Sequence, residues 1–249
     1  MEKQAKTKAF EGERLAKVIA RSGVCSRRDA EKLIASGKVT VNNQKVESPA
    51  LNVKNSDEIK IEGNLLNSPE KTRIWRFHKP KGIVTTNRDP QNRTTIFELL
   101  PKDMPRVVSV GRLDLNSEGL LLLTNDGELS RHLELPTTGW SRKYRVRVHG
   151  KVDAKKLEEL EKGISFEGVN YGVAKVTVER TQGSNAWLVA TIKEGKNREI
   201  RKIMESIGLE VTRLIRVSYG PFQLGNLAKG KVAEVPAKVI KEQLGKYLS

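Results

Sequence analysis

The sequence predicts an α+β protein divided into a small N-terminal domain and a larger mixed domain. Three observations predict this organisation. The chain has 249 residues, which is longer than a chain that folds around a single hydrophobic core of common size. Residues 13–34 carry apolar side chains at helical spacing, and short alternating runs follow up to residue 61. Strand-like runs return at residue 74, after a segment without a period, and continue alongside an amphipathic helix.

Residues 1–11 are expected to form a disordered tail. They are polar and rich in lysine. Such a composition buries too little apolar surface to offset the entropy of ordering a chain. The first domain is therefore expected to span residues 12–62.

Two short helices are predicted at the start of that domain. Apolar side chains at helical spacing indicate a helix from Glu13 to Gly23. The stretch SRRD at 26–29 has a capping-box pattern and opens a second helix that runs through Ile34 and ends at Gly37.

Short strands complete the first domain. Val39 and Val41 alternate with polar residues, Asn42-Asn43 forms a turn, and Ile59 and Ile61 alternate again. The segment that follows lacks a period and contains a proline, so it is predicted to be a linker. The linker covers residues 63–72 and leaves residues 73–249 for the second domain.

The first half of the second domain is predicted to be strands and turns. Residues 74–78 form a β-prone run, and the proline and glycine of KPKG at 79–82 force a turn. Strands are expected at 107–110 and 119–124, with a turn at 125–127.

The second half adds helices to the strands. Residues 143–148 alternate as a strand, and 194–207 are expected to form a helix with one apolar and one basic face. Further strands are expected at 213–217 and 232–235, and a last helix near 238–248.

Charge and composition bound the function. Lys and Arg number 46 against 30 Asp and Glu, a net charge of +16, which favours a polyanionic partner, nucleic acid ahead of an anionic membrane surface. The aliphatic run Leu120–Leu123 is too short to span a bilayer, and the N-terminus lacks the apolar stretch of a signal peptide, so a soluble cytoplasmic protein is expected. Cys25 is the single cysteine and the chain has only three histidines. These residues form no spaced Cys/His cluster, so no metal site is expected.

Basic side chains crowd the two predicted helices of the first domain. Most charge runs are solvated faces, but acidic residues largely miss this stretch and helix starts also favour phosphate. The sequence therefore predicts an RNA-binding face. Its residues are Arg14, Lys17, Arg21, Arg27, Arg28, Lys32 and Lys38.

The same segment resembles a known RNA-binding module. The string ERLAKVIARSGVCSRRDAEKLIASGKVTVNNQKV is similar to an S4 domain. S4 domains precede several kinds of catalytic unit, so this resemblance implies RNA binding without naming an enzyme.

One motif in the second domain carries a stronger resemblance. Asp114 follows a predicted strand on a polar loop, where an aspartate most often makes a turn. The string GRLDLNSEGLLLLTNDGEL resembles the central motif of RNA pseudouridine synthases. The resemblance implies a mixed, largely antiparallel sheet and makes Asp114 the catalytic residue.

Further segments match this family in the same order. The resemblance makes Tyr144 the active-site tyrosine, Arg201 the basic residue that pairs with the catalytic aspartate, and Leu214 a wall of the uracil pocket. From composition alone, Tyr144 is a half-buried strand tyrosine and Arg201 a solvated helix residue. Arg112 is placed to fill the space that a flipped nucleotide leaves.

The chain is most similar to the branch of the family that carries an S4 domain, named for the small-subunit synthase RsuA. Within that branch, EGKNREIRKIMESIGLEVTRLIRVSYG looks more like the RluB group, which modifies large-subunit ribosomal RNA. Arg198-Glu199 stands where RsuA has His-Gln.

The resemblance implies isomerisation of uridine to pseudouridine in ribosomal RNA, most closely the 23S RNA, on naked RNA or a pre-ribosomal subunit. No cofactor is expected, since the reaction needs neither a redox partner nor an external group. Asp114 can attack the ribose or the uracil, or take a ribose proton. Nothing in the sequence suggests an oligomer, so a monomer is expected.

Other functions fit the sequence less well. Residues 225–231 fit GxxxxGK, but Val232 replaces the magnesium-binding Ser or Thr of a P-loop. An S4-bearing methyltransferase needs a glycine-rich nucleotide loop, and no GxGxxG is present. A small-subunit (16S) synthase and a non-catalytic ribosome-assembly factor remain as alternatives. The assembly factor does not require Asp114, Tyr144 and Arg201 together.

Overall fold

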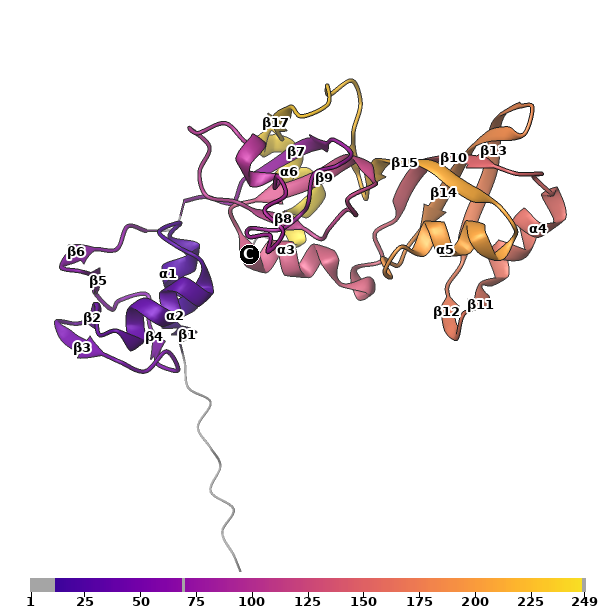
Figure 1. The fold of residues 1–249 in the computed structure, drawn as a ribbon. Coiled ribbons are helices and arrows are strands. Elements are labelled where there is room, and N and C mark those ends of the chain that lie inside the picture. The colour runs from indigo at the N-terminus through magenta and orange to yellow at the C-terminus, as the bar shows by residue number, and fades with distance from the viewer. Residues whose placement is uncertain (1–11, 69, 248–249) are drawn as a thin grey trace, which may run out of the picture. The chain divides into compact units, whose positions relative to one another are not determined.

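A computed structural model describes residues 12–68 and 70–247, so the expected tail at 1–11 lies outside the described residues. Compact packing divides the chain into two units, Met1–Lys71 and Thr72–Ser249. Each unit has its own apolar core (Figure 1).

Two helices and small sheets form the first unit. Helices α1 (Leu15–Arg21) and α2 (Arg27–Ala35) bury their apolar faces on one core, and Ser26 caps α2 by accepting a hydrogen bond from the Asp29 N–H at 3.1 Å. The predicted start of this helix, with Ser26 as its cap, is confirmed. The strands are β1 (Glu13–Arg14), β2 (Val39–Val41), β3 (Gln44–Val46), β4 (Asn52–Val53), β5 (Ile59–Ile61) and β6 (Asn64–Leu65).

Strand β6 differs from the expected linker at 63–72. Asn64 and Leu65 pair with Ile61 and Lys60 of β5, and Leu66 packs against the core of the first unit. A strand of two residues is too short to show an alternating pattern, so no strand could be predicted here. The first part of the predicted linker is a strand of the first unit.

The second unit is built on one nine-stranded sheet. Its main order is β13-β14-β10-β15-β9-β7-β17, with β8 beside β9 and β16 beside β15. All its strand pairs are antiparallel except β9 with β15, so the predicted mixed, largely antiparallel sheet is confirmed. The strands are β7 (Ile74–Lys79), β8 (Val108–Val110), β9 (Glu118–Thr124), β10 (Arg142–His149), β13 (Ala174–Gln182), β14 (Asn185–Ile192), β15 (Glu210–Tyr219), β16 (Phe222–Gln223) and β17 (Val232–Glu234).

One half of the sheet is covered on both faces. Every residue of β9 is buried, which explains its run of four leucines. Helices α3 (Gly127–Glu134) and α6 (Ala237–Leu244) pack on one face of this half. The turn expected at 125–127 is instead the start of α3, because the Asp126 carboxylate accepts hydrogen bonds from the N–H groups of Glu128 and Leu129.

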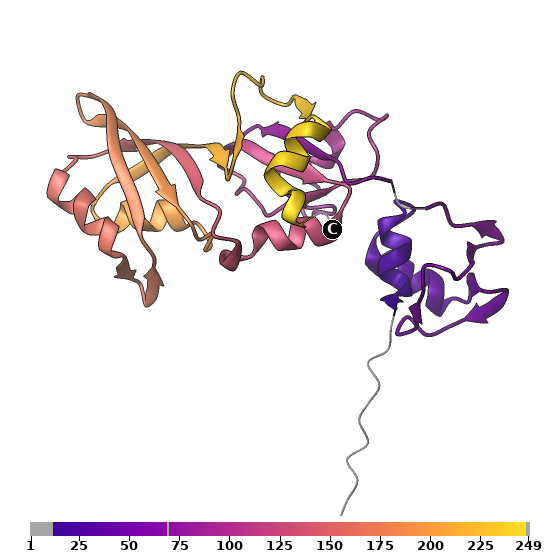
Figure 2. The ribbon, with the colours of Figure 1, turned by 180° about the vertical axis from the view of Figure 1, so that it is seen from behind.

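The other half is covered on one face. Helices α4 (Ala154–Glu159) and α5 (Glu199–Ser206) lie on the same side of β13, β14, β10 and β15, as Figures 1 and 2 show from opposite directions. A small hairpin, β11 (Ile164–Phe166) with β12 (Val169–Tyr171), lies beside α5. Helix α5 begins later than predicted because Arg198 adopts a left-handed conformation directly before it.

Candidate active site

The loop that joins β8 to β9 carries Asp114. The Ser117 N–H donates to the Asp114 carbonyl at 3.0 Å and closes a tight turn. Asp114 is half-buried at the edge of a cleft, whereas Leu113 before it and Ser117 after it are buried. A polar side chain is thus presented from a loop that is anchored on both sides.

A buried lysine holds this loop through hydrogen bonds to its backbone carbonyl oxygens. Lys79, at the end of β7, has no exposed surface and donates to the carbonyl oxygens of Pro80, Asp114 and Ser117 at 3.1, 3.1 and 3.0 Å. Burial lowers the pKa of Lys79 to about 8, while the carboxylates of Asp114 and Glu118 act in the opposite direction. The lysine places a positive charge under the turn that presents Asp114.

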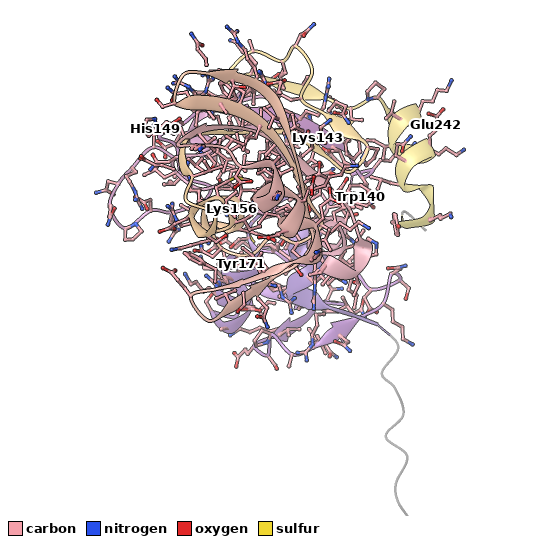
Figure 3. All side chains as sticks on the ribbon, turned by 90° about the vertical axis from the view of Figure 1, so that its right-hand side faces the viewer. Trp140, Lys143, His149, Lys156, Tyr171 and Glu242 are labelled. Carbon is pink, nitrogen blue, oxygen red and sulfur yellow. The ribbon has the colours of Figure 1, made fainter. Side chains whose placement is uncertain are left out.

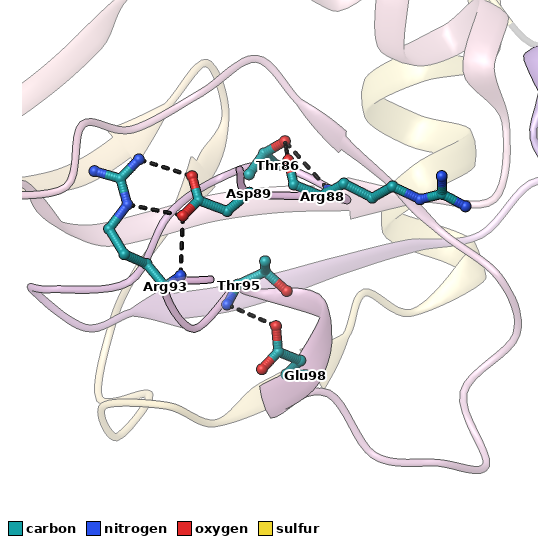
Figure 4. A network of polar contacts seen from close by, with 6 residues as sticks. All are labelled: Thr86, Arg88, Asp89, Arg93, Thr95 and Glu98. Atoms are coloured by element: carbon teal, nitrogen blue, oxygen red, sulfur yellow. Dashed lines mark hydrogen bonds and ion pairs between the residues drawn. The ribbon is translucent and has the colours of Figure 1, made fainter. Parts of the chain in front are cut away.

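A second anchor comes from the segment between β7 and β8. The Thr85 hydroxyl donates to the Leu113 carbonyl at 3.0 Å and accepts from the Leu113 N–H at 3.4 Å. The segment beyond Thr85 is held by its own polar contacts: the Arg93 guanidinium binds both oxygens of Asp89, and the Glu98 carboxylate accepts from the Thr95 N–H (Figure 4). The residue before Asp114 is therefore fixed at both backbone polar groups.

Gly119 brings the loop against the strand that lines the cleft. It lies in β9 opposite Arg216 of β15, at the one parallel pairing of the sheet. Its φ is +107°, and a Cβ atom there would lie 2.3 Å from the Arg216 carbonyl oxygen. Only glycine allows this close approach without a shift of one strand.

A cleft of about 570 Å³ lies on the helix-covered side of the sheet, beside the Asp114 loop. It brings together four of the five predicted active-site residues. Asp114 and Arg112 come from the loop, Tyr144 from β10 and Leu214 from β15, where Val146, two residues after Tyr144, is opposite Leu214. Tyr144 and Leu214 are buried and form an apolar wall, while Arg112 is exposed at the rim.

The fifth residue, Arg201, lies differently from the expectation. Its guanidinium donates to the carbonyl oxygens of Asn116 and Val211 at 3.0 Å each, and no ion pair joins it to Asp114 in the described part of the chain. Burial lowers the pKa of Arg201, followed by the positive charge of Arg198, whereas Asp114 raises it. Arg201 therefore contacts the Asp114 loop through the backbone carbonyl of Asn116, and not through the Asp114 carboxylate.

Comparison with known proteins identifies the family of this chain. The profile of the RNA pseudouridylate synthase family matches residues 73–206, and that of the S4 domain matches residues 13–59. An uncharacterized RNA pseudouridine synthase of Rickettsia prowazekii is 46% identical over 231 residues, which cover 93% of this chain and 97% of that protein. The chain belongs to the RNA pseudouridine synthase family.

Two further relatives agree. Ribosomal large subunit pseudouridine synthase B of Yersinia pestis is 40% identical over 225 residues, covering 88% of this synthase and 70% of the longer relative. A crystal structure described as a pseudouridylate synthase superposes with a TM-score of 0.65 at 28% identity, over 93% of this chain and 99% of that one. The synthase is thus a member of the branch with an S4 domain.

Sequence reasoning missed two buried arginines of the cleft. Arg142 donates to the Tyr219 hydroxyl at 2.9 Å, and Arg216 donates through Nε to the Leu120 carbonyl at 2.7 Å. The Arg216 Nη2 group is buried without a protein acceptor among the described residues. Both arginines lie two residues from a predicted site residue on the same strand, so strand alternation could have found them.

The synthase has a buried carboxylate, Glu118, that pairs with two partly exposed cations beside the loop. The Glu118 carboxylate accepts from Arg213 at 2.6 and 3.2 Å and forms an ion pair with Lys229 at 2.7 Å. Burial alone would raise the pKa of Glu118, but the hydrogen bonds of Arg213 and Lys229 lower it to about 2. Lys229 comes from the loop that fits GxxxxGK, so that loop has a structural partner.

The predicted RNA-binding face of the S4 domain is partly neutralised. Ion pairs join Lys17 and Arg21 to Glu13, Arg27 to Glu31, Lys32 to Asp29, and Lys38 to Glu62. The expectation that acidic residues miss this face was wrong. Arg14 and Arg28 are exposed and have no ion-pair partner among the residues that the structure describes.

Every helix in the described ranges is too short or too polar to cross a bilayer.

Proposed function

We propose that this synthase isomerises a uridine of large-subunit ribosomal RNA to pseudouridine, with Asp114 as the catalytic residue. The observation that carries the proposal is the 40% identity with ribosomal large subunit pseudouridine synthase B, over both the S4 domain and the catalytic domain. The cleft supports it, because the Asp114 side chain lies in the same cleft as the apolar wall formed by Tyr144 and Leu214.

The reaction rearranges bonds within one nucleotide. The bond between C1′ and N1 breaks, the bond between C1′ and C5 forms, C5 loses a proton and N1 gains one. The Asp114 carboxylate attacks the substrate or takes a ribose proton. Tyr144 stacks on the uracil, Leu214 contacts its edge, and the half-buried position of Asp114 limits the water that competes with the substrate.

A base inside a folded RNA must leave its stack to reach this cleft. Arg112 is exposed two residues before Asp114 and lines the same cleft, so its guanidinium can occupy the space that the base leaves. Arg14 and Arg28, two exposed cations of the S4 domain, would bind phosphates at another part of the RNA.

Arg201 supports the catalytic loop through backbone carbonyls in our proposal. Its two hydrogen bonds hold Asn116, two residues after Asp114, against Val211 of β15. Lys79 and Thr85 hold the same loop from other directions, so three buried or half-buried side chains together fix the place of one carboxylate.

A non-catalytic assembly factor is less well supported. Such a protein needs a basic surface, but it does not need a buried lysine and a close strand approach to present an aspartate in a cleft. A small-subunit substrate is also less well supported, because several relatives named for the large subunit each match at 40% identity.

The test is pseudouridine mapping of 23S and 16S ribosomal RNA from cells with and without the gene, and with an Asp114→Asn copy. One 23S position should lose pseudouridine in the deletion and in the Asp114→Asn strain, and regain it with the wild-type gene. A lost position in 16S RNA would transfer the substrate to the small subunit. Unchanged modification in both RNAs would support the assembly factor. Conversion of a 23S transcript by the purified protein in EDTA would check that no metal is needed.

A further inference from the structure

Strand β10 separates two sets of side chains. Arg142, Tyr144, Val146 and Val148 are buried on the side of α4 and α5, and the residues between them are exposed on the opposite side. Strand β14 alternates in the same way, with Trp187, Val189 and Thr191 half-exposed. This opposite side of the sheet faces away from the cleft, because Tyr144 and Leu214 both point toward the helices.

Cations gather on this side of the sheet. Strand register places Arg147 opposite both Trp187 and Arg213, and Thr191 opposite both Lys143 and Lys175. We call this surface the outer basic face. Figure 3 looks toward this end of the unit and labels Lys143 and His149 at the two ends of β10, above Lys156 of α4. The outer basic face consists of Lys143, Arg145, Arg147, Lys175, Arg213 and Trp187.

Two of these cations oppose each other directly. Arg147 and Arg213 are cross-strand partners, and like charges in that position destabilise a sheet. Glu118 binds Arg213, but among the described residues no carboxylate pairs with Arg147, Lys143 or Lys175. An external anion would relieve this repulsion.

The arginines around Trp187 are held in place. The Arg145 guanidinium lies 4.8 Å from the Trp187 ring centroid and that of Arg213 lies 5.9 Å from it. Arg145 uses Nε and Nη2 on a single oxygen of Glu179, so its Nη1 group remains available to a ligand. Fixed guanidinium groups lose little side-chain entropy when they bind a phosphate, and they match its geometry.

We propose that the outer basic face binds the phosphodiester backbone of a second segment of the RNA substrate. The inference rests on the proposed function, because it assumes an RNA partner. The sheet lies between this face and the cleft, so the bound segment is not the one that carries the target uridine. A structured ribosomal RNA would then contact both sides of the catalytic unit.

The experiment compares two double variants with the same change of charge. Lys143→Glu with Arg147→Glu reverses two cations of the outer basic face, and Lys155→Glu with Lys156→Glu reverses two exposed lysines of α4. Affinity is measured by filter binding at several salt concentrations, with a long fragment of 23S RNA and with a short hairpin that carries the target uridine.

The outer-face variant should bind the long fragment about ten-fold more weakly than the α4 variant, and its salt slope should fall by about two in magnitude, one for each lost phosphate contact. Its affinity for the hairpin should match that of the α4 variant. Equal losses in both variants, or no loss in either, would overturn the proposal. So would unchanged RNA binding with altered self-association, which would assign the face to a second copy of the chain.

Two controls keep the test decisive. Lys143→Gln with Arg147→Gln replaces the Glu variant if that one fails to fold, and it should give a smaller loss in the same direction. Pseudouridine formation in the hairpin by the wild-type protein is scored separately. Its absence would count against the proposed function, whereas the binding comparison alone decides the outer basic face.

Discussion

The ammonium group of Lys79 donates a hydrogen bond to the backbone carbonyl of Asp114 at 3.1 Å, although 35 positions separate the two residues. Burying the charged ammonium group of a lysine without hydrogen-bond partners would destabilise the fold, because the charge leaves water. Here three carbonyl oxygens accept from it, and the carboxylates of Asp114 and Glu118 lie close enough to oppose the effect of burial on its pKa.

Lys79→Met should therefore impair both the loop and the fold. The change leaves the carbonyls of Asp114 and Ser117 without their buried donor, and each such loss costs about 1–3 kcal/mol. We expect kcat to fall more than KM rises, because the Asp114 carboxylate would be displaced from its position in the cleft. Single-turnover assays and urea unfolding measure the two effects. An active variant of wild-type stability would show that the lysine does not position the loop.

The same lysine predicts a pH dependence of stability. Its pKa is lowered to about 8 in the folded protein from 10.5, so between these values the unfolded chain binds more protons than the folded one. The contribution of Lys79 to the free energy of unfolding should thus rise from about pH 8 to about pH 10.5. The difference between wild type and Lys79→Met isolates it, and it should grow in favour of the wild type with pH. A flat difference would mean that the lysine keeps an ordinary pKa.

Gly119→Ala should strongly destabilise the catalytic unit. The added methyl group would meet the Arg216 carbonyl oxygen and amide nitrogen, at 2.3 and 2.6 Å, and φ is positive. We expect a loss of at least about 3 kcal/mol, measured by urea unfolding with tryptophan fluorescence. Gly127→Ala is the matched control, because nothing lies within 4 Å of its Cβ position at the start of α3, and it should be neutral or stabilising. Equal effects of the two changes would contradict the close approach.

Some of this site could be predicted from the sequence and some could not. The resemblance of three separate segments to the family predicted Asp114, Tyr144 and Leu214 as site residues, and all three line one cleft. The role of Lys79 had no local signal, because KPKG indicates only a turn and the acceptors of the lysine lie far along the chain.

Other features were present in the sequence but were not used. Helix α3 has an Asp126 cap and apolar residues Leu129 and Leu133 four apart, which is a helix signal that the NDG turn pattern concealed. Arg142 and Arg216 share strand faces with Tyr144 and Leu214. By contrast, the partners of Arg201 are backbone carbonyls of residues distant in sequence, and no pattern of residue types encodes them.

Arg14 and Arg28 of the S4 domain should matter most for RNA binding. Arg14 and Arg28 are exposed and have no ion-pair partner within the described residues, whereas Lys38 pairs with Glu62 at 2.7 Å. Arg14→Ala and Arg28→Ala should each reduce the salt slope of binding by about one. Lys38→Ala should have a smaller effect, because the phosphate must compete with Glu62. Filter binding across salt concentrations checks this, and equal effects at all three positions would show that the ion pairs do not limit binding.

Arg201→Ala separates two roles for this arginine. In the structure it holds the Asn116 carbonyl, so its loss should lower kcat about 10- to 100-fold, or ~1.4–2.7 kcal/mol, at every pH. A direct pair with Asp114 would instead keep the carboxylate ionised, and its loss would move the acidic limb of the pH–rate profile upward. We expect the uniform loss, and a shifted acidic limb would restore the direct pair.

Asp114→Asn should abolish pseudouridine formation while RNA affinity stays within a few fold of the wild type. The amide keeps the shape of the side chain but can neither attack nor accept a proton at neutral pH. The fold should be retained, because the hydrogen bonds that anchor this residue come from Lys79 and Ser117 to its backbone carbonyl, which the substitution leaves in place. Tritium release from C5-labelled uridine under single-turnover conditions measures the chemistry, and filter binding measures the affinity. Release at the wild-type rate would remove Asp114 from the mechanism. Tyr144→Phe is the companion variant: it keeps the stacking ring in the buried wall of the cleft, so any loss of tritium release reports the hydroxyl alone.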